Sequence, residues 1–245
     1  MKSPRKKQRT SGLFTQMAVL GKASRPSKAI VSLKGCAHFR QAVAHLARAD
    51  RVLARLIKKI GPCRLKPELR VSPFAALVEA VVYQQLNGKA AASILARVKA
   101  LFPGHKFPRP EDFLGMPDER LRAAGLSRAK LVAIRDISEK TLAGVVPSSR
   151  AITRMSDGEI VERLTTLRGV GRWTVEMLLI FKLGRPDVLP ATDYGVRQGF
   201  ARTYGWSELP TPVELEAHGE PWRPYRTVAA WYLWRSLELI GNHQA

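Results

Sequence analysis

Hydrophobic residues recur along most of this chain at spacings of three and four positions. The spacing is regular in the first well-patterned segment, at Phe39, Val43, Leu46, Leu53, Leu56, Ile57 and Ile60. Such spacing places apolar side chains on one face of a helix. No segment alternates between apolar and polar residues for long enough to predict a sheet. The pattern therefore predicts an all-α fold.

Local signals mark where the predicted helices begin and end. Ser72 and Pro73 have the residue types of an N-cap and a first helical position. Ser156 and Glu159 form a capping-box signature at the start of another helix. Thr192 is the expected N-cap of a later helix. The remaining helices are expected at about 89–101, 111–114, 118–123, 128–142, 173–182 and 225–240.

The same pattern gives the domain organisation. Residues 1–35 are basic and poorly patterned, which predicts a disordered arm. Residues 36–245 are expected to form one helical unit with two lobes. The central lobe is placed at about 72–183, and the second lobe combines about 36–71 with 186–245.

Charge narrows the range of partners. The formal net charge is +21, and the chain before Asp50 contains no Asp or Glu but eleven Lys or Arg. Such a chain favours polyanions such as nucleic acid. No apolar run approaches the length of a membrane span. Cys36 and Cys63 are too few for a disulfide framework or a four-thiolate cluster and suggest a reducing compartment.

The stretch Leu167–Thr174, LRGVGRWT, joins two predicted helices through a turn with two glycines. Glycine tolerates positive φ and lets the backbone approach a ligand closely. The first amides of the following helix have no partners within the helix and lie at its positive end, where a phosphate binds readily. A plain structural turn explains the same residues, and both readings stay open on this motif alone.

A second feature is Asp193, 22 positions after Gly171 in the segment GRPDVLPATDY. A carboxylate at the start of a helix can simply stabilise the helix dipole. It can also serve as a catalytic group.

Together, LRGVGRWT and GRPDVLPATDY resemble the helix-hairpin-helix, Gly/Pro-Asp superfamily of DNA glycosylases. The closer resemblance is to its alkylpurine branch, DNA-3-methyladenine glycosylase II. It extends over about residues 40–240 and includes the segments SPFAALVEAVVYQQLNGKAAASI, GLSRAK and PWRPYRTVAAWYLWR. The resemblance implies a two-lobed helical fold with the active site in the cleft between the lobes, and it places the hairpin at 160–182.

The resemblance also implies a role for individual residues. Asp193 would be the catalytic carboxylate, and Leu86 the wedge that fills the space of the everted nucleotide. The implied base pocket contains Trp173, Met177, Trp231 and Tyr194. Met177 departs from relatives that carry an aromatic residue there, which leaves the accepted bases open. The hairpin residues expected at the phosphate are Gly169, Gly171, Arg172 and Thr174. Lys130 and Arg197 are further phosphate contacts or plain surface charges.

Other implications concern cofactors. Bifunctional relatives carry a lysine nucleophile where Trp173 stands, so the resemblance implies a monofunctional enzyme without lyase activity. No cofactor and no iron–sulfur cluster are expected. The histidines are scattered, so no metal site made of side chains is expected. A monovalent cation held by the backbone carbonyls of Thr165, Leu167 and Val170 is carried over from relatives.

The function expected from the sequence is hydrolytic excision of alkylated purines, of the 3-methyladenine and 7-methylguanine type, in base-excision repair. The partner is double-stranded DNA with a damaged base, and the protein is expected to be a monomer. In a bacterium it would lie in the cytoplasm, at the nucleoid. The alternatives are a glycosylase for a deaminated, oxidised or mismatched base, and a non-catalytic helix-hairpin-helix DNA-binding module.

Overall fold

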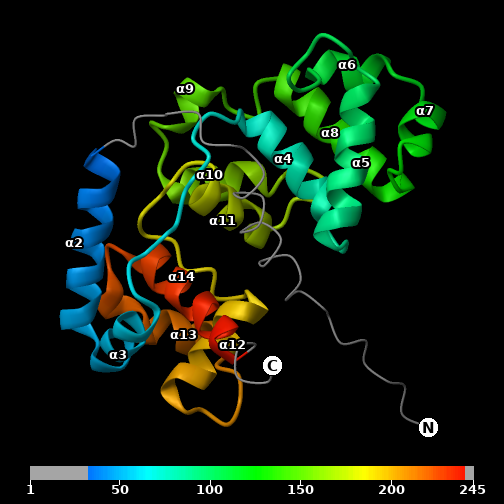
Figure 1. The fold of residues 1–245 in the computed structure, drawn as a ribbon. Coiled ribbons are helices and arrows are strands. Elements are labelled where there is room, and N and C mark those ends of the chain that lie inside the picture. Colours follow the sequence, from blue (N-terminus) through cyan, green and yellow to red (C-terminus); the bar gives the residue numbers. More distant parts are fainter. Residues whose placement is uncertain (1–32, 241–245) are drawn as a thin grey trace, which may run out of the picture.

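The computed structural model describes residues 33–240 and contains helices without strands in that range (Figure 1). Packing divides the helices into two groups. The first comprises α4 (Pro73–Tyr83), α5 (Gly88–Ala100), α6 (Pro110–Gly115), α7 (Asp118–Ala123), α8 (Arg128–Leu142), α9 (Ser149–Ile152), α10 (Asp157–Leu164) and α11 (Arg172–Phe181). The second comprises α2 (Leu33–Ala49), α3 (Arg51–Ile60), α12 (Tyr194–Tyr204), α13 (Pro212–His218), η2 (Glu220–Trp222), α14 (Arg226–Ser236) and η3 (Glu238–Ile240).

Helix α4 is the centre of the first group. It packs against α5, α8 and α11, and most of its residues are buried. Ser72 begins it as predicted, because its Oγ accepts a hydrogen bond from the amide of Ala75 at 3.2 Å and Pro73 follows. The capping box of α10 is also confirmed, with Ser156 and Glu159 bonded reciprocally.

In the second group, α14 packs against α2, α3 and α12. Asp50 joins these elements, since its Oδ1 caps α3 at the amides of Val52 and Leu53. Its Oδ2 accepts the Tyr204 hydroxyl and the Trp222 indole N–H. One carboxylate therefore ties α3 to α12 and to η2.

The crossing of α12 and α14 depends on a glycine. A Cβ atom added at Gly199 would lie 2.1 Å from the carbonyl oxygen of Leu233. No side chain fits at that distance, so the two helices approach this closely only because residue 199 is glycine. The crossing matters for the site, because α12 begins directly after Asp193 and α14 contains Trp234.

Some predicted boundaries were wrong. Helix α2 begins at Leu33, inside the predicted arm of residues 1–35, and the rest of that arm lies outside the described residues. The last predicted helix, at about 225–240, is divided into α14 and η3. None of the helices within residues 33–240 is both long enough and apolar enough to span a bilayer.

We predict that Gly199→Ala destabilises the protein, because the new methyl group meets the backbone of α14. Overpacking of this kind costs about 1–3 kcal/mol or more. Thermal unfolding measures the effect. Gly158→Ala is the matched control, since a Cβ atom there meets nothing within 4 Å. An unchanged melting temperature for Gly199→Ala would contradict the close helix crossing.

Candidate active site

Asp193 is the N-cap of α12, and its Oδ1 accepts a hydrogen bond from the amide of Val196 at 2.8 Å. The prediction that Thr192 caps this helix was therefore wrong. The amide of Asp193 donates to the carbonyl of Pro190 at 2.9 Å, so the preceding turn extends through residue 193. Helical conformation begins one residue later than expected. Asp is as good an N-cap as Thr, so the sequence alone did not decide between them.

Two indole N–H groups hold the carboxylate of Asp193. Trp234 Nε1 donates to Oδ1 at 2.8 Å, and Trp173 Nε1 donates to Oδ2 at 2.7 Å. Trp234 belongs to α14 and Trp173 to α11, so the two groups of helices meet at this carboxylate. Sequence reasoning missed Trp234. Tryptophan is usually read as a core residue, and no sequence signal indicated that its N–H would face an acid.

The hydrogen bonds leave the two oxygens of Asp193 unequal. Oδ1 accepts two bonds, from Val196 and Trp234, whereas Oδ2 accepts one from Trp173. A carboxylate oxygen has room for about two donors. Oδ2 therefore keeps accepting capacity for a further group. The residue is 6% exposed, so such a group must approach closely and beside the Trp173 indole.

The connection between α10 and α11 forms an exposed hairpin. Gly169 has φ +75°, where a side chain would be strained, and an added Cβ would lie 3.1 Å from Ala133. Gly171 caps α11 without any side-chain hydrogen bond. The first amides of α11 thus lie at the positive end of a ten-residue helix and can bind an anion.

The turn between α4 and α5 is bonded to this hairpin. Gln84 Nε2 donates to the carbonyl of Gly169 at 3.0 Å. Gln85 has φ +58°, an uncommon value for a residue with a side chain, and strain of this kind often marks a functional site. Leu86 follows and is partly buried. The predicted wedge residue therefore lies on a strained turn that is tied to the predicted phosphate-binding loop.

The exposure of the other predicted site residues differs widely. Tyr194 is 39% exposed, and Trp173 is partly exposed. By contrast, Met177 and Trp231 are 3% and 4% exposed, and the guanidinium of Arg235 covers the Trp231 ring at 5.4 Å. The roles of these residues in a base pocket stay predictions.

The predicted phosphate contacts also differ. Gly169, Gly171 and Arg172 are exposed, whereas the side chain of Thr174 is buried.

Two of the candidate phosphate contacts each donate a hydrogen bond to the protein backbone. Lys130 Nζ donates to the carbonyl of Val82 at 2.7 Å, and burial lowers the pKa of this lysine. Arg197 Nε donates to the carbonyl of Pro210 at 2.6 Å. Both side chains therefore hold structure together.

Metal binding by side chains has no support in the part of the chain that is described. No three His, Cys, Asp or Glu side chains gather there in a way that could hold an ion. The carbonyls of Thr165, Leu167 and Val170 remain a predicted cation site. Of these, the Leu167 carbonyl already accepts the amide of Val170 at 3.1 Å.

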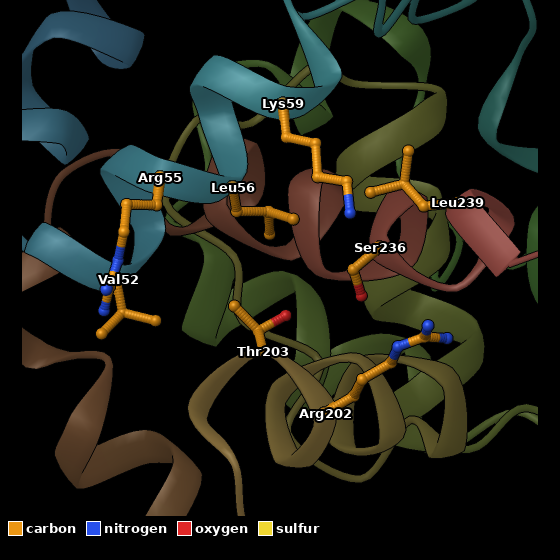
Figure 2. Close-up of a pocket in the computed structure, with 8 residues that line it drawn as sticks. All are labelled: Val52, Arg55, Leu56, Lys59, Arg202, Thr203, Ser236 and Leu239. Carbon is orange, nitrogen blue, oxygen red and sulfur yellow. The ribbon is translucent and has the colours of Figure 1, made fainter.

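A hollow of about 240 Å³ lies between α3, α12 and α14, away from Asp193 (Figure 2). Lys59 and Arg202 line it, together with Ser236 and Thr203. Both hydroxyls donate to backbone carbonyls, at Leu233 and Gly199, so only the cations can donate to a bound anion. The hollow adds to the positive surface of the second helix group, and it is lined by the last turn of α12, at the opposite end of that helix from Asp193.

Comparison with known proteins places this arrangement in a family. Residues 78–224 match the family described as HhH-GPD superfamily base excision DNA repair protein. DNA-3-methyladenine glycosylase 1 of Schizosaccharomyces pombe is 40% identical over 81% of this chain and 88% of that protein. The alkylbase DNA glycosidase-like protein mag2 of the same yeast is 35% identical over 84% of this chain and 97% of its own length.

Solved structures agree with these sequence matches. The S. pombe 3-methyladenine DNA glycosylase Mag1, in complex with abasic DNA, superposes with a TM-score of 0.73 at 41% identity. That match covers 80% of this chain and 95% of Mag1. A DNA-3-methyladenine glycosidase from Bacillus halodurans gives a TM-score of 0.74 at 35% identity, over 82% of this chain and 91% of its own. The chain has the hairpin and, after it, an aspartate that caps the next helix. With these matches, the chain belongs to the HhH-GPD superfamily of base excision DNA repair proteins.

Proposed function

We propose that this protein is a monofunctional DNA glycosylase that excises alkylated purines from double-stranded DNA. The observation that carries the proposal is the Asp193 carboxylate, which indoles from both helix groups hold near the hairpin. Relatives at 40% and 35% identity bear the names of alkylbase glycosylases, which supports the choice of substrate.

The enzyme must first bring the damaged nucleotide out of the duplex. A base inside the stack cannot be reached, and eversion costs a few kcal/mol. The hairpin amides would bind the backbone phosphate, while Leu86 would enter the space that the base leaves. The Gln84–Gly169 hydrogen bond fixes the wedge turn relative to the hairpin, so both contacts act from one rigid unit.

Asp193 would then act on the sugar. Cleavage of the glycosidic bond develops positive charge on the deoxyribose, and a nearby carboxylate stabilises that charge. Oδ2 is the oxygen with spare capacity, so it would face the sugar or the attacking water. An N-alkylated purine already carries positive charge as a leaving group. No second acid is then needed to protonate it.

The partly exposed residues around Asp193 suit a cationic base. The π-faces of Trp173 and Tyr194 would attract an alkylated purine by about 0.5–2 kcal/mol. Trp231 would contribute only on the side of its ring that Arg235 leaves open. Met177 would supply a polarisable but non-aromatic wall if the pocket extends to its buried side chain.

We predict that Asp193→Asn reduces the release of methylated purines from alkylated DNA by at least about 100-fold, the scale of a lost charge-stabilising group. The Asn side chain would also direct its NH2 group toward an indole N–H donor, so one of the two indole hydrogen bonds would be lost. Single-turnover base release measures the effect, with circular dichroism to confirm folding. Wild-type activity in this variant would contradict the catalytic assignment. DNA binding by both proteins without base release by either would favour a binding module.

Trp234→Phe should lower the single-turnover rate by about tenfold, because a hydrogen bond to a charged group contributes about 1.5–3 kcal/mol. The ring still fills the core, so DNA affinity should change little. Trp222→Phe is the matched control, since it removes an indole bond to Asp50, away from the site. Equal rate losses in the two variants would show that packing, not alignment of Asp193, explains the effect.

The product should be an abasic site in an intact strand. Schiff-base cleavage needs an amine nucleophile, and Trp173 stands at the position of the lysine that bifunctional relatives use. Gel analysis with and without alkaline treatment tests this prediction. Strand breaks that appear without alkali, together with a covalent protein–DNA adduct formed when borohydride reduces a Schiff-base intermediate, would contradict it.

A further inference from the structure

A cavity of about 330 Å³ lies beside the hairpin, between the two groups of helices. Its walls come from α10, α11, residues 187–189, α13 and α14. The charged residues that line it are Asp157, Glu162, Glu176, Asp187, Glu216, Arg172 and Arg226. Carboxylates outnumber cations here, although the chain as a whole carries a net charge of +21.

Glu176 is the most enclosed of these acids. It is 4% exposed, and its Oε1 accepts a hydrogen bond from Arg172 Nε at 2.9 Å. Its Oε2 is buried without a hydrogen-bond partner. A buried carboxylate with one unsatisfied oxygen costs folding free energy, because it has left water without gaining a full set of hydrogen bonds. Stability therefore does not explain why an acid occupies this position.

The partner of Glu176 lies at the hairpin. Arg172 is the first residue of α11, directly after Gly171, and its side chain is 64% exposed. Among the described residues, no other acid forms an ion pair with it. Its Nε edge is thus fixed against Glu176. The side chain starts at the first residue of the helix whose amides are expected to bind a phosphate, and most of it is open to solvent.

We propose that Glu176 is a positioning residue for DNA binding, which holds the Nε edge of Arg172 while the outer edge of the guanidinium contacts a backbone phosphate. This inference rests on the proposed function. A planar guanidinium that is held on one side loses less conformational freedom when it binds a phosphate on the other.

The pKa of Glu176 also lies near neutral pH. The pKa of Glu176 is raised to about 7, chiefly by burial; Arg172 opposes the rise, and the nearby charges of Glu216 and Asp193 add to it. Above that pH the carboxylate is ionised and anchors Arg172 strongly. Below it the neutral acid anchors Arg172 weakly. The contribution of Arg172 to DNA affinity should therefore increase as the pH rises through 7. Asp157, Glu162, Asp187 and Arg226 also face the cavity.

The test is a double-mutant cycle in the affinity for an undamaged duplex, measured by fluorescence anisotropy at about pH 6 and about pH 8, on either side of the titration. We expect Arg172→Gln to weaken binding about tenfold at the higher pH and about threefold at the lower, in the range of single phosphate contacts. When Glu176→Gln is already present, Arg172→Gln should weaken DNA binding about threefold at both pH values. Because both variants are compared at the same pH, the effects of histidines and other titrating groups on affinity cancel in the difference.

Glu162→Gln is the matched control, because it removes an acid from the same cavity without touching Arg172. It should leave the pH dependence of the Arg172→Gln effect intact. An Arg172→Gln effect that is equal at both pH values, or that Glu176→Gln does not change, would overturn the proposal.

Thermal unfolding separates this role from a structural one. Because the folded-state pKa of Glu176 is raised from 4.5 to about 7, its ionisation lowers stability as the pH rises through that interval, and the full loss is present above the folded-state pKa. Glu176→Gln should therefore raise the melting temperature more at the higher pH. A loss of melting temperature at that pH would show a structural role and overturn the proposal. Base release by the wild-type protein is measured separately. The double-mutant cycle therefore tests the role of Glu176 in DNA binding even if the protein releases no base.

Discussion

The structure depends on the way two indole N–H groups hold one carboxylate. Trp173 and Trp234 come from different groups of helices and donate to the two oxygens of Asp193. A misplaced carboxylate would lose much of its effect on a developing charge, since electrostatic stabilisation requires donors and charges that are already in position. The packing of the two groups therefore determines the geometry around Asp193, the proposed catalytic carboxylate, and the close crossing at Gly199 contributes to that geometry as well as to the core.

The surroundings of Asp193 suggest how binding and chemistry are divided. The hairpin and the wedge turn form one bonded unit through Gln84 and Gly169, and this unit belongs to the first group of helices. Asp193 and Trp234 belong to the second. DNA that is bound by the first group would bring its everted sugar toward the carboxylate of the second. The carboxylate is enclosed, which excludes water and strengthens its effect on charge.

The acidic cavity beside the hairpin contains a carboxylate whose burial costs stability. Most acids of this basic chain are exposed or paired on the surface, whereas Glu176 is buried with one oxygen unsatisfied. Proteins often retain stability losses at sites where a charge or a strained residue serves binding or catalysis. Gln85 has a positive φ and is a second locally unfavourable feature, on the turn that carries the predicted wedge residue Leu86.

Local spacing and short-range capping predicted the helical class, most helix boundaries and the hairpin, whereas the role of Asp193 was implied by the resemblance to the glycosylase superfamily and stays a prediction. The sequence did not determine that Asp193, rather than Thr192, caps α12, since both residue types can do so. Only the tertiary structure showed the bond from Trp234 to Asp193, the burial of Glu176 and the enclosure of Met177 and Trp231. These features depend on which side chains meet across helices far apart in the chain, and hydrophobic periodicity contains no information about such contacts.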